Sequence, residues 1–200
     1  MTNPMGSNDK GTHETDSGNA ERLVRQFGDE IRYCYPWRKW LVWDGRRGTP
    51  DTSGRVMAMG KTVVREIYAE GALGEDEGHR KARARWAMRS ESRERRRALV
   101  DLAQNESGIP VLPEELDTDP WLLNCLNGTV DLRTGKRRDH RSEDLITKLA
   151  PVEFDPAAQC PLWDAVLERL LPDPDVRSFV VRAVGWTLTG DPGDHRLILC

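Results

Sequence analysis

The most constraining feature of this sequence is a stretch from His79 to Gln104 that contains neither glycine nor proline. Arginine and alanine, which both favour helices, are abundant in it. Near its end, apolar residues recur at helical spacing, at Leu99, Val100, Leu102 and Ala103. The stretch therefore predicts one long helix, strongly charged over its first two-thirds and amphipathic at its end.

Positive charge is concentrated in the same stretch. Residues 79–97 hold nine lysines and arginines against Glu91 and Glu94, a local charge of +7. The whole chain has 30 basic and 33 acidic residues and a net charge of −3, so the remainder carries −10. Such a helix fits contact with nucleic-acid phosphates, or a solvated helix. The candidate nucleic-acid-binding residues are Arg80, Lys81, Arg83, Arg85, Arg89, Arg93, Arg95, Arg96 and Arg97.

The segment before this stretch predicts a small α/β region. Residues 1–17 are polar and without periodic apolar positions, which is typical of a disordered tail. A short helix is expected to start with Asp16 or Asn19 as its cap and to reach Phe27. Residues 30–35 and 39–43 predict a hairpin, and residues 61–70 a short helix. The hairpin is expected to expose an aromatic rim of Trp37, Trp40 and Trp43.

After Gly108 the sequence becomes β-like. Strands are predicted at residues 111–112, 121–126, 129–132 and 145–154. Asn127-Gly128 and Thr134-Gly135 are predicted turns. Helices follow at residues 161–171 and 174–189, and the apolar run at 197–200 predicts a buried strand. The prediction is an α+β fold in four segments: a tail (1–17), a hairpin region (18–74), the basic and amphipathic helix (75–107), and a β-rich plus helical segment (108–200).

No catalytic, cofactor-binding or metal-binding residues are predicted. Gly60-Lys61-Thr62 matches the end of a phosphate-binding loop, but Arg55 stands where that motif needs its first glycine, so an ordinary helix start is expected. Acidic clusters at 75–77, 114–119 and 173–175 lie beside glycine or proline, where caps and turns are common. His140, in a basic loop, fits a phosphate contact or, more simply, a solvated loop.

Cysteine spacing and hydropathy bear on the compartment. The four cysteines are far apart and form no Cys-x-x-Cys pair, which argues against a zinc site or a disulfide framework and favours a reducing cytoplasm. No run approaches the ~20 apolar residues of a membrane span, and no signal segment is present. A cytoplasmic protein without a membrane partner is expected.

Two long ordered strings carry a resemblance to a known family. The first begins with residues 15–23 and includes Ile31-Arg32-Tyr33 and residues 40–45. The second comprises residues 115–124, 127–135, His140, 144–148, Cys160-Pro161 and 185–191. Over about residues 15–200, the chain resembles the region that precedes the helicase domain in phage and plasmid primase-helicases of the poxvirus-type superfamily 3 helicase group.

The resemblance implies a role in DNA replication. Full-length members are ATP-dependent helicases and primases, hydrolases that use ATP and Mg²⁺. Residues 197–200 correspond to the strand that leads into the family's phosphate-binding loop, so neither cofactor nor catalysis is expected in this chain itself. The expected function is an accessory module that positions DNA and docks to a helicase-domain polypeptide or self-associates. The alternatives are a protein-interaction or assembly domain, or a truncated fragment without independent activity.

Overall fold

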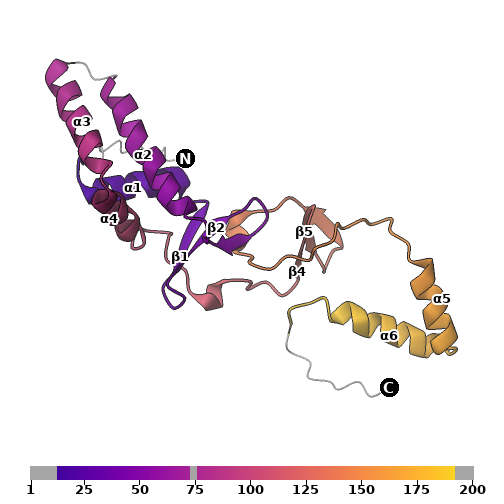
Figure 1. Ribbon diagram of the computed structural model, residues 1–200. Helices are drawn as coiled ribbons and strands as arrows, with labels where there is room; N and C mark the ends of the chain where they lie inside the picture. Colours follow the sequence, from indigo (N-terminus) through magenta and orange to yellow (C-terminus); the bar gives the residue numbers. More distant parts are fainter. Residues whose placement is uncertain (1–12, 73–75, 192–200) are drawn as a thin grey trace, which may run out of the picture. The chain divides into compact units, whose positions relative to one another are not determined.

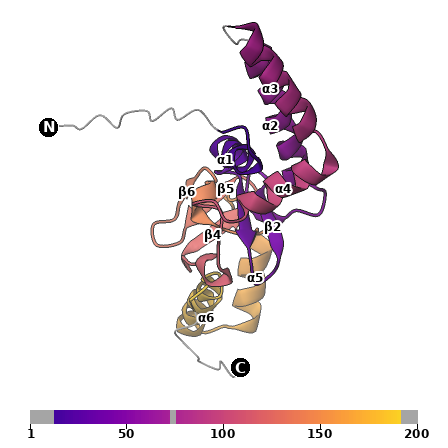
Figure 2. The ribbon, with the colours of Figure 1, turned by 90° about the vertical axis from the view of Figure 1, so that its left-hand side faces the viewer.

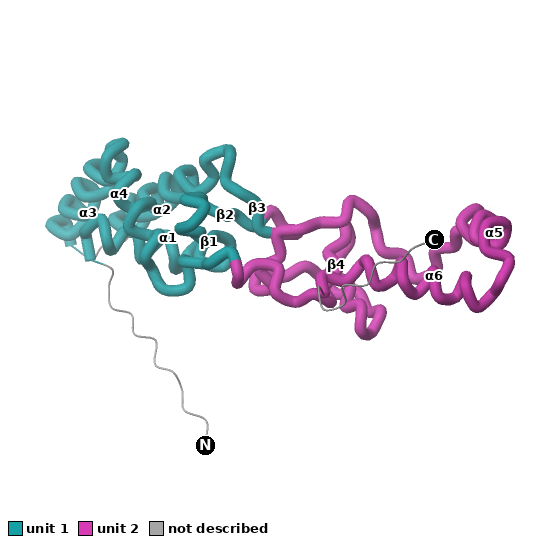
Figure 3. Tube along the Cα trace, turned by 90° about the horizontal axis from the view of Figure 1, so that it is seen from below, with its two compact units in different colours: residues 1–43, 48–113 teal, residues 44–47, 114–200 magenta. Residues whose placement is uncertain are grey.

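The computed structural model describes residues 13–72 and 76–191, which form two compact units. The described residues contain six α-helices and two three-stranded antiparallel sheets, so the predicted α+β class is confirmed (Figure 1). Unit 1 comprises residues 1–43 and 48–113, and unit 2 comprises residues 44–47 and 114–200 (Figure 3). No helix in the described part of the chain is long and apolar enough to cross a membrane.

Unit 1 begins with helix α1, Asp16–Phe27. Its cap is Thr15, whose Oγ1 accepts a hydrogen bond from the Gly18 amide at 3.0 Å, so the prediction of Asp16 or Asn19 as cap was wrong. Asn19 is instead buried, and its amide donates to the Ser90 hydroxyl at 3.1 Å. The Asn19 side chain, which the local sequence suggested as a helix cap, therefore forms a tertiary hydrogen bond. The predicted tail lies mostly in residues 1–12, outside the described residues.

Helix α2, Arg55–Ala72, begins six residues before the predicted start. The Asp51 carboxylate sets this start by accepting hydrogen bonds from the amides of Arg55 at 2.9 Å and Val56 at 3.0 Å. Gly60 is buried inside the helix, where an added Cβ would lie 3.3 Å from Leu99 Cδ2. Gly60 thus allows close packing of α2 on α4.

The single long helix predicted after residue 79 is wrong. The structure has two helices, α3 (Glu77–Ser90) and α4 (Arg93–Ala103). Ser92 caps α4 by accepting a hydrogen bond from the Arg95 amide at 3.2 Å, which ends one helix and starts the next. Figure 2 shows α2 and α3 side by side, with α4 at an angle to α3. The break lets Leu99 and Val100 pack into the core while α3 lies along α2.

The sheet of unit 1 contains β1 (Ile31–Cys34), β2 (Lys39–Trp43) and β3 (Gly48–Pro50), in that order. The predicted hairpin is confirmed, with Tyr33 opposite Trp40, whereas β3 was not predicted. The predicted strand at 111–112 is reduced to hydrogen bonds beside β1, such as Val111 N–H to Tyr33 O at 3.0 Å. Helices α1, α2 and α4 and strands β1 and β2 enclose one core, which includes Leu23, Ile31, Val42, Val56, Val63, Leu99 and Ile109.

The sheet of unit 2 contains β4 (Leu122–Cys125), β5 (Gly128–Asp131) and β6 (Lys136–Arg138). The hairpin around residue 127 is confirmed, but its register differs from the prediction. Cys125 pairs with Gly128, so the loop is Leu126-Asn127. Asn127 is needed elsewhere: its side chain donates to Phe154 O at 3.0 Å and accepts from Phe154 N–H at 2.9 Å. The turn at Thr134-Gly135 is confirmed, and β6 was missed.

The remainder of unit 2 is partly irregular. Short 3-10 turns occur at Pro113–Glu115 and Ser142–Asp144. The predicted strand at 145–154 is wrong: Leu145 has φ +50°, and the segment contributes only isolated hydrogen bonds beside β4, such as Leu126 N–H to Val152 O at 2.8 Å. Helices α5 (Pro161–Leu170) and α6 (Pro174–Trp186) match their predictions closely. The strand predicted at 197–200 lies outside the described residues.

Candidate nucleic-acid interface

Three of the nine predicted contact residues form ion pairs within unit 1, and a fourth is half-buried. Arg83 pairs with Glu70 of α2 at 3.5 Å and with Glu14 at 3.7 Å. Arg95 donates to the Asp16 carboxylate at 3.3 Å and lies over the Trp86 ring. Lys81 pairs with Glu77 one turn earlier, at 2.6 Å. Arg96 is the half-buried residue, and its Nε is shielded from solvent without a hydrogen-bond partner among the described residues.

These contacts differ in how far they leave each positive charge free to bind a ligand. The guanidinium groups of Arg83 and Arg95 connect α3 and α4 to α2 and α1, so their charges are already partly neutralised. Lys81 and Glu77 are both mostly exposed, at 68% and 73% of their side-chain surfaces. An exposed pair of this kind is weak and opens readily to a competing phosphate. Lys81 therefore remains available, whereas Arg83 and Arg95 serve the fold.

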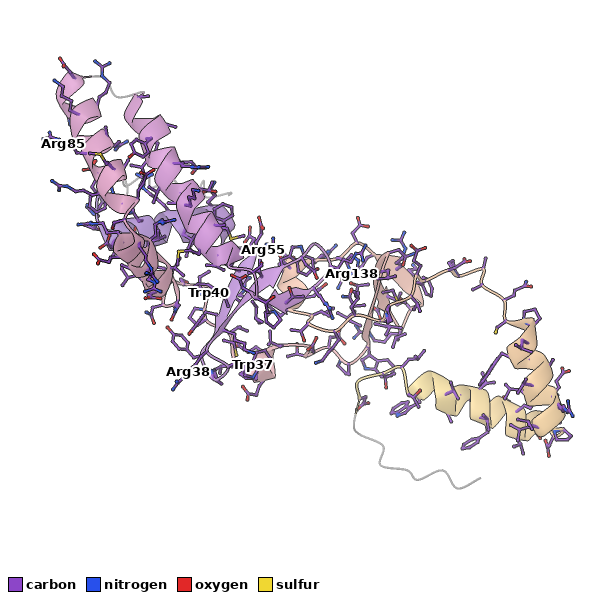
Figure 4. All side chains as sticks on the ribbon, viewed as in Figure 1. Trp37, Arg38, Trp40, Arg55, Arg85 and Arg138 are labelled. Atoms are coloured by element: carbon purple, nitrogen blue, oxygen red, sulfur yellow. The ribbon has the colours of Figure 1, made fainter. Side chains whose placement is uncertain are left out.

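A row of basic side chains covers the outer face of α3. Lys81, Arg85 and Arg89 are spaced four residues apart, so they lie on one side of the helix. Ala87 and Ser90 are buried and mark the opposite side. Figure 4 shows Arg85 on the side of α3 that faces away from α2. We call Lys81, Arg85 and Arg89 the α3 basic row.

Arg85 and Arg89 are exposed and have no carboxylate within ion-pair distance in the described part of the chain. The only side-chain hydrogen bond found for either guanidinium joins Arg85 Nε to Lys81 O at 3.2 Å, within the described residues. Adjacent like charges on one helix face repel each other, which costs a few tenths of a kcal/mol per pair. A polyanion relieves that repulsion, so the row is suited to bind phosphates.

The remaining predicted residues lie outside the row. Arg80 is exposed near the start of α3, but helical periodicity puts it on the side of Ala87, and Arg93 and Arg97 are exposed on α4. Glu94 and Asp101 share that outer face of α4, so its charge is mixed. The structure thus does not bring all nine residues to one surface. It divides them into the α3 basic row, three exposed residues outside it, and the partly buried Arg83, Arg95 and Arg96.

A second exposed feature of unit 1 is the tip of the β1–β2 hairpin, residues 35–39. Of the predicted aromatic rim only Trp37 is strongly exposed, at 43%, while Trp40 and Trp43 are half-buried. Tyr35, also 43% exposed, was missed, although its place beside Pro36-Trp37 was visible in the sequence. Arg38 and Lys39 lie next to these rings and are exposed.

Several of the acidic residues singled out in the sequence have structural partners among the described residues. Asp117 accepts hydrogen bonds from the Thr147 amide, at 2.6 Å, and hydroxyl. Asp119 pairs with Arg133 at 2.9 Å, and Asp173 caps α6 by accepting from the Asp175 amide at 2.8 Å. Among residues 13–72 and 76–191, no cluster of histidine, cysteine and carboxylate side chains is suited to hold a metal.

ATP and Mg²⁺, which the resemblance implies for the full-length family, do not fit Gly60-Lys61-Thr62. The triplet lies in the interior of α2, where backbone amides are committed to helical hydrogen bonds and cannot encircle a phosphate. The prediction that this triplet is not a phosphate loop agrees with the structure, except that it lies inside a helix and not at its start.

His140 belongs to a hydrogen-bond network centred on Asn124, which is 3% exposed. The Asn124 amide donates to Arg46 O and Lys148 O, both at 3.0 Å. Its oxygen accepts from the Thr129 hydroxyl at 3.0 Å and faces His140 Nδ1 at 2.8 Å. This contact makes His140 a part of the framework of unit 2 and not the solvated loop residue that the sequence favoured.

The chain matches the model of a known protein family. This model, described as D5 N terminal like, covers residues 20–172, about three quarters of the chain. The matched range spans all of the described elements from the middle of α1 to the end of α5. No curated protein matches the chain.

Proposed function

Because this chain belongs to the D5 N terminal like family, the N-terminal domains of D5-like primase-helicase proteins, we propose that it positions DNA for a replicative helicase. The α3 basic row carries the proposal. Arg85 and Arg89 project from α3 without a carboxylate partner in the described residues, and Lys81 is held only by an exposed pair. Each of these cations displaces a condensed counterion when it contacts a phosphate, and this release drives binding.

The experiment is a titration of a DNA oligonucleotide at several salt concentrations. Wild-type affinity should fall by roughly 0.7 log units per log unit of salt for each phosphate contact on a single strand, and by roughly 0.9 on a duplex. The triple variant Lys81→Ala, Arg85→Ala, Arg89→Ala should flatten the slope by about 2 on a single strand. An unchanged slope in this variant would contradict the α3 basic row as the contact surface.

The matched control removes the same residue types elsewhere. Lys136, Arg169 and Arg182 are exposed in unit 2. Their simultaneous replacement by alanine changes the net charge by the same amount. The control should retain the wild-type salt slope, because the phosphate contacts are proposed to lie on α3 and the control leaves α3 unchanged. A control variant that binds as weakly as the triple variant would show that overall charge, and not the α3 surface, governs affinity.

Helicase docking is the second part of the proposal, and α5 and α6 support it. An amphipathic helix normally buries its apolar side, but apolar residues of α5 and α6 are exposed: Leu162 is 76% exposed, Leu170 69% and Phe179 50%. Exposed apolar surface of this kind is typical of interaction sites. We propose that a helicase-domain polypeptide covers it, as the family's place beside a helicase suggests.

Size measurement with and without a helicase-bearing polypeptide tests this docking. A complex is expected that is weakened by Leu162→Glu and Phe179→Glu, whereas Met88→Glu, an equally exposed apolar position of unit 1, should have no effect. Complex formation without any DNA affinity would favour the alternative function, a protein-interaction or assembly domain. A self-association that the same two variants abolish would identify a second copy, and not a helicase, as the occupant.

A further inference from the structure

We propose that the tip of the β1–β2 hairpin is a base-stacking site for single-stranded nucleic acid, with Trp37 as its main platform. The proposal rests on the proposed DNA contact. It adds that the bound DNA is single-stranded, because only unpaired bases expose their faces to a side chain. The site comprises Tyr35, Trp37, Arg38 and Lys39. It is separate from the α3 basic row, since it lies in the sheet of unit 1 and not on its helices.

The aromatic rings at the hairpin tip are exposed. Trp37 and Tyr35 are each 43% exposed, whereas Tyr33 and Trp40 of the same hairpin pack against the core. Figure 4 shows Trp37 and Arg38 at the end of the hairpin, with Trp40 closer to the helices. Burial against a base would remove apolar ring surface from water.

Hydrogen bonds and ring contacts hold the base of the hairpin tip in place. The Tyr35 hydroxyl donates to the side-chain oxygen of Asn105, just beyond α4. Tyr33 meets the Tyr35 ring edge-on, with centroids 4.8 Å apart, and meets Trp40 at 5.1 Å. Backbone hydrogen bonds of Tyr33 to Ile109 O and from Val111 N–H, at 2.8 and 3.0 Å, anchor this cluster. A fixed platform loses little conformational entropy on binding, which favours affinity.

The hairpin tip is positively charged. Residues 35–40 contain Arg38 and Lys39 and no carboxylate. Neither cation has an ion pair among the described residues. Arg38 has φ +51°, a left-handed conformation that non-glycine residues rarely adopt, and its amide donates to Tyr35 O at 3.0 Å. The turn thus places two cations directly after Trp37 in the chain, where a phosphate that follows a stacked base can be met.

Nucleic acid fits these observations better than a peptide does. A proline-rich peptide can pack on tryptophan and tyrosine, but it gains nothing from two adjacent unpaired cations. A single strand uses both features, because each nucleotide supplies a planar base and a phosphate. Sequence preference is expected to be slight, since every base has a π face and the hairpin tip presents no set of directed hydrogen-bond groups to the base edges.

The test compares two probes that carry the same charge. One is a mixed-sequence single-stranded oligonucleotide of about 16 nucleotides, and the other is an abasic strand of equal length. Wild type should bind the first about tenfold more tightly than the second, which is the effect of one stacked base. Trp37→Ala should reduce this ratio to near one, whereas Trp37→Tyr should preserve most of it. Trp163→Ala is the matched control, because Trp163 of α5 is also 43% exposed.

The outcomes separate this inference from the proposed function. Equal affinity of wild type for the two strands overturns base stacking while leaving phosphate contact intact. A ratio that survives Trp37→Ala in a protein with wild-type thermal stability also overturns it. The α3 triple variant should weaken binding of both strands and keep their ratio. Absence of binding to either strand at low salt contradicts the proposed function itself, and stacking with it. Binding of a proline-rich peptide that competes with neither strand and is lost in Trp37→Ala would assign the hairpin tip to a protein partner and overturn base stacking.

Discussion

The guanidinium of Arg95 lies over the indole ring of Trp86, with its Cζ 4.7 Å from the ring centroid. Its Nη1 also donates to the carboxylate of Asp16 at 3.3 Å, at the start of α1. Arg95 therefore joins three helices: its own, α3 and α1. The relationship shows that part of the arginine-rich sequence in this region serves the fold.

Arg95→Ala should lower the free energy of unfolding by about 1 kcal/mol, because it removes a half-exposed cation–π contact and an ion pair. The slope of DNA affinity against salt should not change. Arg93→Ala, an exposed neighbour on the same helix, is the control and should leave stability within about 0.5 kcal/mol. Urea unfolding measures both. Loss of salt dependence in Arg95→Ala at unchanged stability would contradict the structural role of Arg95 and make it a phosphate contact.

Asp51 predicts a pH effect on stability. Burial alone would raise its pKa, but hydrogen bonds from the backbone amides of Val56, Arg55, Ser53 and Gly54 outweigh burial and hold the pKa below 3.8. Because the pKa is lowered in the folded state, this stabilisation is fully present above about pH 4 and is lost as the pH falls through the folded pKa.

Asp51→Ala should destabilise unit 1 by about 1 kcal/mol at neutral pH, the usual effect of losing a helix cap. The difference from wild type should shrink under acid conditions, where the wild-type carboxylate is protonated. Asp29→Ala, at an exposed position of the same unit, serves as the control. Thermal unfolding across a pH series is the measurement. A difference that stays constant down to pH values well below 3.8 would contradict the amide-bonded carboxylate.

Much of the fold followed from local pattern. The β1–β2 hairpin, β4, β5, α5 and α6 were predicted because strands, turns and amphipathic helices have short-range signatures. The break between α3 and α4 was not predicted, since serine occurs inside helices as well as at their caps. Only the packing of α3 on α2 and of Leu99 in the core shows that Ser92 must start a new helix.

The sequence identified the basic residues of the candidate site, but not which of them share a surface. The nine basic residues were identified, but which of them face inward depends on Glu14, Asp16 and Glu70, residues distant in sequence. The register around Asn127 was also missed because it depends on a distant residue. Two hydrogen bonds between the Asn127 side chain and the Phe154 backbone decide which residues form the turn. Local sequence cannot contain such long-range partners.

Asn124→Ala should destabilise unit 2 by about 3 kcal/mol, since it removes four hydrogen bonds from a buried position and leaves the Arg46 and Lys148 carbonyls without that donor. Glu153→Ala, an exposed change in the same unit, is the comparison. Hydrogen exchange should show faster exchange across β4 and β5 in Asn124→Ala and not in unit 1. A variant as stable as wild type would contradict the network.

Thiol labelling should distinguish the described cysteines. Cys160 is exposed, whereas Cys34 and Cys125 are buried. Burial also raises the pKa of the Cys125 thiol, so less of the reactive thiolate exists near pH 8. Mass spectrometry of peptides after brief labelling should find Cys160 modified first, with the other two reacting only as urea unfolds the chain. Early labelling of Cys125 would contradict its burial in unit 2.

The most direct test of the account is the salt dependence of single-stranded DNA binding by the wild-type chain. Three contacts from the α3 basic row predict a slope of log affinity against log salt of about −2, from roughly 0.7 for each phosphate. The hairpin cations would make it steeper. We expect a wild-type slope of −2 or steeper. In the Lys81→Ala, Arg85→Ala, Arg89→Ala variant, the slope should fall to near zero or to the contribution of the hairpin cations alone. Undetectable binding at low salt, or a slope near zero in wild type, would contradict the account.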